Sequence, residues 1–205
     1  MYTHVIWDID NTMVSSGGVI LRALARLLRE EKGVELTDDL HQHLVGLTSR
    51  NILRYFEFND MAAAEEKWNE YIFSDSEGFQ AYDGVIETLH KLKEDGFALG
   101  IVTSRNESEM HDSCLDELLP LFDCVVQAEE VKKPKPDPES LRLYCARSGA
   151  RPEEILYIGD GPADALCCEA VGVDFALALW GCYNPGLVSS AKYRLNAPEE
   201  ILKLV

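Results

Sequence analysis

The chain repeats one pattern, in which a short apolar run ends in polar residues and a stretch with helical spacing follows. The apolar runs are Val5-Ile6-Trp7, Phe97–Val102, Cys124–Gln127, Ile155–Ile158 and Val173–Leu179. Runs of this length are typical of strands that are buried on both faces of a sheet. Because helical stretches separate the later runs, the pattern predicts an α/β fold: a Rossmann-like parallel sheet with helices on both faces.

Residues 16–80 follow a different pattern and contain no convincing strand. Ile20, Leu24, Leu27 and Leu28 recur at helical spacing, and Gly33 then ends the helix. Further helix starts follow, so this segment is predicted to be an inserted bundle of about four helices. We therefore predict an α/β core formed by residues 1–15 and 81–205, with residues 16–80 as a helical cap domain.

The charge of the chain restricts its partners. Among 205 residues, 36 are acidic and 19 are basic, which gives a formal net charge of −17. A phosphate backbone is bound through clustered lysine and arginine, so nucleic acid and anionic membranes are disfavoured as partners. A small anionic ligand needs only a local positive site, and such a ligand remains possible.

Targeting signals and cysteine spacing indicate the compartment. The N-terminus has no basic region followed by a long apolar run, and no stretch approaches the ~18 apolar residues of a spanning helix. The six cysteines show no Cys-x-x-Cys spacing, and two of them are adjacent. This spacing of the cysteines favours reduced thiols over a disulfide framework or a metal site. A cytoplasmic location is therefore expected.

Polar residues follow the predicted strands at the edge where ligands bind in open parallel sheets. They are Asp8 and Asp10, Thr103 and Ser104, Lys133, and Asp160 with Asp164. Several clustered carboxylates repel one another and need a positive charge to stay ionised. A hard divalent cation such as Mg²⁺ supplies that charge and suits a few carboxylates together with water and a substrate phosphate.

Each of these residues also has a structural interpretation. Asp160 or Asp164 taken singly could form a turn or cap a helix, and capping explains Ser104 better than binding does. Lysines 132, 133 and 135 could form a solvated basic turn. A purely structural role for Asp8 and Asp10 would leave two close acids without a partner. Polar residues also occur at four separate strand ends, and this coincidence favours a single site.

These segments resemble the four motifs of the haloacid dehalogenase superfamily, in the family's order and across nearly the whole chain. The matching segments are Asp8-Ile9-Asp10-Asn11-Thr12, Thr103 after an apolar strand, Lys133-Pro134 followed by Pro136, and Gly159-Asp160-Gly161-Pro162-Ala163-Asp164. The helical insert resembles the small cap of the phosphoglycolate phosphatase and β-phosphoglucomutase branch. Asn11 stands where the family usually has glycine, and asparagine also tolerates a left-handed backbone.

The resemblance implies a role for each acidic residue. Asp8 would be the nucleophile that forms a phosphoaspartyl intermediate, and Asp10 would exchange protons with the leaving alcohol and the attacking water. Mg²⁺ would be held by Asp8, the backbone carbonyl of Asp10, and Asp160, while Asp164 would orient its water ligands.

The resemblance also implies substrate contacts. Thr103 and Lys133 would bind the phosphoryl oxygens, with Ser104 beside them. Arg50, in a segment that resembles the cap loop facing the active site, would meet a second anionic group, although an exposed helix residue is an equal interpretation. Arg105 remains open between the same two interpretations.

The function that these roles imply is a Mg²⁺-dependent phosphatase acting on a small phosphorylated metabolite, with phosphoglycolate as one plausible substrate. The alternative is a phosphosugar mutase, which uses the same core and returns the phosphoryl group to the sugar. A dehalogenase would leave Asp10 and the metal ligands without a task, and a phosphate-binding regulator would not need a nucleophile beside an acid. A monomer is expected from the resemblance.

Overall fold

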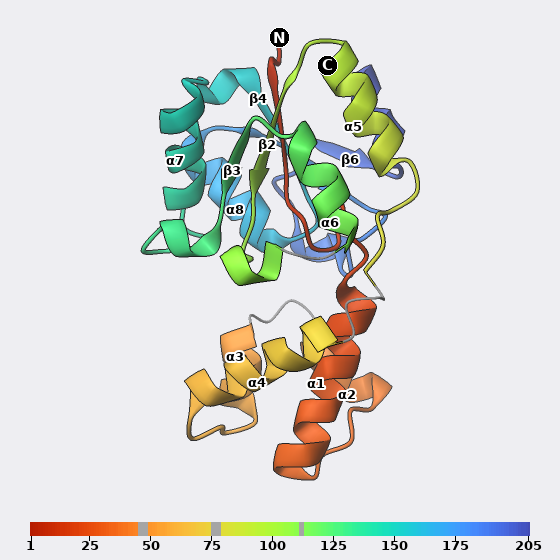
Figure 1. The fold of residues 1–205 in the computed structure, drawn as a ribbon, viewed down its shortest axis with the longest axis vertical. Helices are drawn as coiled ribbons and strands as arrows, with labels where there is room; N and C mark the ends of the chain where they lie inside the picture. The colour runs from red at the N-terminus through yellow and green to blue at the C-terminus, as the bar shows by residue number, and fades with distance from the viewer. Residues whose placement is uncertain (45–48, 75–78, 111–112) are drawn as a thin grey trace. The chain divides into compact units, whose positions relative to one another are not determined.

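The computed structural model describes residues 1–44, 49–74, 79–110 and 113–205 (Figure 1). The chain divides into two compact units. One unit contains residues 1–15 and 80–205, and the other contains residues 16–79. The first unit holds every strand of the sheet.

The sheet has six strands in the order β3-β2-β1-β4-β5-β6. Their bounds are β1 His4–Trp7, β2 Ala98–Val102, β3 Cys124–Val126, β4 Ile155–Gly159, β5 Asp174–Ala178 and β6 Tyr193–Leu195. All neighbouring strands pair in parallel. The predicted α/β fold class is therefore confirmed, whereas β6 is an edge strand that the apolar pattern did not predict.

The order of the strands reverses beside β1, and this reversal positions the site. The chain runs outward from β1 through β2 to β3, then returns to β4 on the other side of β1 and continues to β5 and β6. At such a switch point the loops leave in opposite directions and open a crevice at the carboxyl ends of the strands. Asp8 and Asp160 follow the two central strands, so their positions adjoin that crevice.

Helices cover both faces of the sheet. They are α5 Val85–Glu94 and α6 Ser113–Leu118 on one face, and α7 Glu139–Ser148 and α8 Pro162–Val171 on the other (Figure 1). Beneath α7 and α8 lies a buried cluster that includes Tyr144, Tyr157 and Phe175. A short 3₁₀ helix, η2 (Glu107–Met110), lies between β2 and α6 in sequence, and another 3₁₀ helix, η7 (Pro198–Lys203), lies near the C-terminus.

The second unit is helical in its described part. Its helices are α1 Gly17–Lys32, α2 Asp38–Leu44, α3 Ser49–Tyr55 and α4 Met61–Ser74. Leu27, Leu53 and Trp68 belong to its buried core, and Gly33 ends α1 in a left-handed conformation. The unit therefore has an apolar core of its own, as a separate lobe requires.

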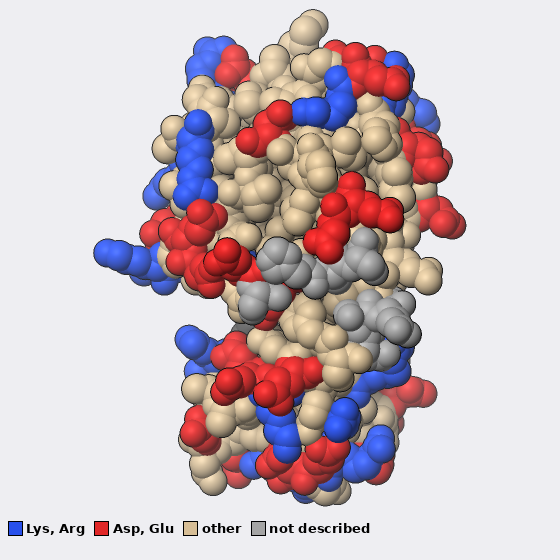
Figure 2. Space-filling model, in the orientation of Figure 1, with Lys and Arg blue, Asp and Glu red and all other residues tan. Residues whose placement is uncertain are grey.

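The surface, the helices and the cysteines add three observations. Acidic and basic side chains are interspersed on the face drawn in Figure 2, and the residues described there form no continuous basic surface. None of the helices in the described ranges has the length and apolar character that crossing a bilayer requires. The six cysteines all lie in the described ranges, and no disulfide joins any of them.

Gly100 in β2 gives a test of the core packing. A Cβ at this position would lie 2.2 Å from Cε2 of Tyr144, so Gly100→Ala must displace a buried ring and should cost about 1–3 kcal/mol. At Gly18, on the exposed side of α1, a Cβ would meet only Arg22 Nη1 at 3.5 Å. Thermal unfolding should show a lower Tm for Gly100→Ala and no loss for Gly18→Ala. Equal Tm values for the wild type and Gly100→Ala would contradict this packing.

Candidate active site

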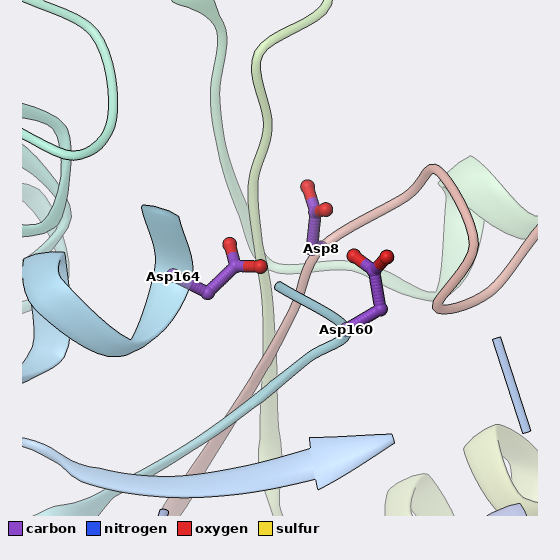
Figure 3. Close-up of side chains that lie close together, drawn as sticks. All are labelled: Asp8, Asp160 and Asp164. Carbon is purple, nitrogen blue, oxygen red and sulfur yellow. The ribbon is translucent and has the colours of Figure 1, made fainter. Parts of the chain in front are cut away.

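Three carboxylates meet at the switch point of the sheet. Asp8 follows β1, Asp160 follows β4, and Asp164 lies in the first turn of α8. Each offers an oxygen that lies within 4.8 Å of an oxygen of the other two, and Figure 3 shows the three side chains turned toward a common space. Residues that are more than 150 positions apart in sequence, Asp8 and Asp160, are thus brought together.

The backbone around the site is shaped for this approach. A Cβ at Gly159 would lie 2.6 Å from Cγ of Asp164, so only glycine lets this carboxylate approach the end of β4. The N–H of Gly161 donates a hydrogen bond of 3.2 Å to Asp164 Oδ2. Asn11 has φ of 56°, which shows that asparagine adopts the left-handed turn expected of the usual glycine.

The lysine of the site is Lys135, so the prediction that placed Lys133 there is wrong. Lys135 Nζ donates hydrogen bonds of 2.7 Å to both Asp8 Oδ1 and Asp164 Oδ1. Lys133 is exposed, and its backbone N–H donates to the Glu139 carboxylate. The physical reason is that two buried carboxylates need a positive charge beside them. The side chain of Lys135 is buried with them and supplies that charge.

The sequence contained a signal for this register. Lys133-Pro134-Lys135-Pro136 and Lys135-Pro136-Asp137-Pro138 are two overlapping copies of the same Lys-Pro-x-Pro spacing. Periodicity cannot choose between the copies, because both lie in one loop and both contain a lysine. Lys135 is identified by its contacts with the buried acids Asp8 and Asp164, and these contacts are visible only in the three-dimensional structure.

Tyr157 completes the surroundings of the lysine and was not among the predicted site residues. Its hydroxyl accepts a hydrogen bond of 3.2 Å from Lys135 Nζ and lies 2.9 Å from the carbonyl oxygen of Val102. The same carbonyl accepts from Lys135 Nζ at 3.1 Å. Lys135 is therefore held by neutral oxygens as well as by two carboxylates, which fixes its ammonium in place.

Burial controls the ionisation of these groups. Burial raises the pKa of Asp8 to about 7, although the charge of Lys135 opposes the shift. Burial and the nearby Asp164 and Asp8 carboxylates also raise the pKa of Asp160 well above its usual range. Burial works against the charge of Lys135, but Asp164 and Asp8 outweigh it and raise the pKa of the lysine.

The donor set of the site fits a divalent cation. Three carboxylates lie close together and the Lys135 ammonium contacts two of them, which leaves an excess of negative charge in a buried place. Among the described residues no lysine or arginine forms an ion pair with Asp160. Hard oxygen donors with excess negative charge are the ligands that Mg²⁺ prefers, so the residues fit the predicted ion.

Asp10 has a different environment from the other acids. Its carboxylate forms a two-fold contact with Arg105, in which Nη2 lies 2.8 Å from Oδ1 and Nε lies 3.0 Å from Oδ2. Its side chain is thus paired with Arg105 and is not a member of the three-carboxylate cluster. Only its backbone carbonyl would serve as a metal ligand, and that part of the prediction stays a prediction.

The other predicted substrate contacts differ in their placement. Thr103 follows β2 and is buried, and its Oγ1 accepts a hydrogen bond of 3.1 Å from the N–H of Arg105. Ser104 is exposed and makes no side-chain hydrogen bond within the described ranges. Arg50 is an exposed residue in the first turn of α3, and residues 46–48 before it lie outside the described residues. The roles of Ser104 and Arg50 stay predictions.

Comparison with known proteins identifies the class. The haloacid dehalogenase-like hydrolase family matches residues 5–178. Pyrophosphatase PpaX of Bacillus velezensis is 29% identical, covering 98% of this chain and 95% of the relative. Phosphoglycolate phosphatase of Nitrosospira multiformis is 28% identical, covering 89% and 85%.

A solved structure supports the fold. The crystal structure of a candidate phosphoglycolate phosphatase from Lactobacillus plantarum superimposes with a TM-score of 0.91 at 22% identity, covering 100% of both chains. Since its family model matches residues 5–178, the chain belongs to the haloacid dehalogenase-like hydrolase family, and the two curated relatives named above are phosphatases.

The two lysines of the loop provide a matched pair for mutagenesis. Lys135→Met removes the ammonium that contacts Asp8. It should lower kcat/KM for phosphate release by at least ~100-fold, because the positive charge beside the reacting carboxylate is lost. Lys133→Met removes an exposed charge from the same loop and should leave kcat/KM within about threefold. Activity assays with purified variants decide between the lysines. Loss of activity in Lys133→Met alone would reverse the assignment.

Ionisation of Asp8 should appear in the stability of the metal-free protein. The folded-state pKa of about 7 lies above that of an unfolded aspartate, so the folded state binds an extra proton between about pH 4 and 7. By linkage, the contribution of Asp8 to the free energy of unfolding falls as the pH rises through this window. In a chelator, Tm of the wild type relative to Asp8→Asn should therefore decrease from about pH 5 to about pH 8.

Added Mg²⁺ supplies the missing positive charge, so the Tm of the wild type should fall less with rising pH in Mg²⁺ than in the chelator. The Tm of Asp8→Asn should respond less to Mg²⁺. Differential scanning calorimetry measures both Tm values. A relative Tm that rises with pH in the chelator would contradict the upward shift of the Asp8 pKa.

Proposed function

We propose that the protein is a Mg²⁺-dependent phosphatase that hydrolyses a small phosphate monoester through a phosphoaspartyl intermediate on Asp8. One observation carries the proposal: the Asp8 carboxylate lies buried at the switch point, 2.7 Å from a buried lysine ammonium and inside a cluster of acids that fits a cation. A nucleophilic carboxylate beside two positive groups is suited to attack an anionic phosphate, since those charges offset the repulsion.

The first half of the reaction transfers the phosphoryl group. A carboxylate oxygen of Asp8 attacks phosphorus, and the bond between phosphorus and the leaving oxygen breaks as the new bond forms. Lys135 stabilises negative charge on the phosphoryl oxygens, and the buried Thr103 at the end of β2 is positioned to donate to them. Asp10 donates a proton to the leaving alcohol.

The second half hydrolyses the intermediate. Asp10 takes a proton from a water molecule, which attacks phosphorus and releases phosphate and the free carboxylate of Asp8. Asp8, the carbonyl of Asp10 and Asp160 would hold Mg²⁺, with Asp164 orienting its water ligands. The bound ion would supply charge stabilisation for the phosphoryl oxygens.

The substrate range follows from the relatives and from the second unit. The names of the curated relatives include pyrophosphatase and phosphoglycolate phosphatase, and both substrates are small and carry a second anionic group. The helical unit of residues 16–79 is the predicted cap domain, and caps and lids select the leaving group in other enzymes. Phosphoglycolate and pyrophosphate are therefore the first substrates to test.

Phosphate release from a panel of monoesters and pyrophosphate, with Mg²⁺ and with a chelator, tests the proposal. The wild type should release phosphate only when Mg²⁺ is present. Asp8→Asn should lower the rate by more than ~1000-fold because the nucleophile is lost, while its fold is retained. Asp95→Asn, an exposed acid at the end of α5, is the matched control and should behave as wild type.

Mass spectrometry after rapid quenching should find a phosphoryl group on the peptide that contains Asp8. Turnover by Asp8→Asn, or a phosphoryl group on another residue, would contradict the mechanism. Interconversion of a sugar 1-phosphate and 6-phosphate without release of phosphate would instead support the mutase alternative.

A further inference from the structure

We propose that Arg105 is a positioning residue that fixes the Asp10 carboxylate for proton transfer to the leaving group. The inference rests on the proposed function, because it assigns Asp10 the proton-transfer step. It differs from a role in binding substrate, since it has Arg105 act through Asp10 and not on the phosphate. Arg105 forms an ion pair with Asp10, and the loop that carries Arg105 holds its guanidinium in place.

The ion pair has the geometry of a fixed fork. Nη2 of Arg105 lies 2.8 Å from Asp10 Oδ1, and Nε lies 3.0 Å from Oδ2. Two parallel hydrogen bonds set the plane of a carboxylate, which a single bond or a point charge does not. The Asp10 side chain is 30% exposed, so without this fork its rotation would be less restrained.

Arg105 is itself held firmly. Its side chain is only 4% exposed, and its Nη1 donates a hydrogen bond of 3.0 Å to the carbonyl oxygen of Glu109. Asn106 and Glu109 close the loop reciprocally, since the N–H of each residue donates to the side chain of the other. The guanidinium is thus anchored to a short, well-bonded loop before it contacts Asp10.

The same loop is joined to the phosphoryl-binding end of the sheet. The N–H of Arg105 donates to Thr103 Oγ1 at 3.1 Å, and its carbonyl accepts from the N–H of Ala128 at 3.0 Å. Thr103 follows β2 and Ala128 follows β3, so Arg105 relates Asp10 to two neighbouring strand ends. The position of the proton-transfer group is therefore coupled to the position of the predicted phosphoryl-binding hydroxyl.

This arrangement is compatible with proton transfer. A carboxylate has about four lone-pair sites, and a guanidinium fork occupies only two of them, so the fork by itself does not exclude a proton from either oxygen. General acid catalysis requires the acid to lie within hydrogen-bond reach of the leaving oxygen, so alignment of Asp10 determines how effective it is. The fork supplies that alignment before substrate binds.

Two classes of substrate separate positioning of Asp10 from other roles. An alkyl phosphate has a poor leaving group that needs a proton, whereas p-nitrophenyl phosphate has a leaving group that departs without one. The value of kcat/KM reports the steps up to formation of the phosphoaspartate, so it isolates the step in which the leaving group departs.

Arg105→Met should lower kcat/KM for ethyl phosphate by about 100-fold or more, and for p-nitrophenyl phosphate by less than about fivefold. Arg105→Lys keeps the charge but not the fork, and it should show the same selective loss to a smaller extent. Arg147→Met is the matched control, because Arg147 lies in α7 and also forms an ion pair with an acid, Glu130. It should change neither value.

A double-mutant cycle tests whether Arg105 acts through Asp10. Asp10→Asn combined with Arg105→Met should lose no more activity on ethyl phosphate than Asp10→Asn alone, because the effect of Arg105 requires the carboxylate. Additive losses would overturn the proposal. So would equal losses on the two substrate classes, or a gain of activity in Arg105→Met, which would show that the pair restrains the enzyme.

The structural outcome can be judged separately from activity. Phosphate release by the wild type tests the proposed function alone, and the ratio between substrate classes in the variants tests Arg105. Crystal structures of wild type and Arg105→Lys should show Asp10 in different side-chain orientations. An unchanged Asp10 orientation in a folded variant would overturn the inference even if no substrate were found.

Discussion

The contact between the Lys135 ammonium and the carboxylates of Asp8 and Asp164 is the interaction on which the site depends. A buried lysine is costly unless it is paired, and the same is true of buried carboxylates. Each of the two ion pairs has a length of 2.7 Å, and the three side chains come from different segments of the chain. The contact therefore fixes the end of β1, the start of α8 and the loop before α7 relative to one another.

This contact does not balance the negative charge of the three carboxylates in the site. The Lys135 ammonium contacts Asp8 and Asp164 but forms no ion pair with Asp160, and burial raises the pKa of Asp8 and of Asp160. A fold selected for stability alone would replace such a cluster with apolar residues or pair every acid. The structure instead keeps a buried group of acids whose excess negative charge a bound cation would offset, and this connects the fold to the proposed chemistry.

The apolar runs and their polar ends predicted the parallel sheet and the edge at which Asp8, Asp160 and Asp164 meet. They could not predict β6, because three residues at an edge give too short a pattern. They could not choose between Lys133 and Lys135, because both follow the same local spacing and only burial beside the acids distinguishes them. Nothing in the sequence indicated that Arg105 is the partner of Asp10, since the two residues are 95 positions apart and the whole second unit lies between them in sequence.

The most direct test is the position of a bound cation. Crystals of the protein grown with Mn²⁺ as a substitute for Mg²⁺ would reveal the ion by anomalous scattering. The account predicts one ion coordinated by carboxylate oxygens of Asp8 and Asp160, with the Lys135 ammonium still in contact with Asp8. An ion bound elsewhere, with these carboxylates uncoordinated, would contradict it.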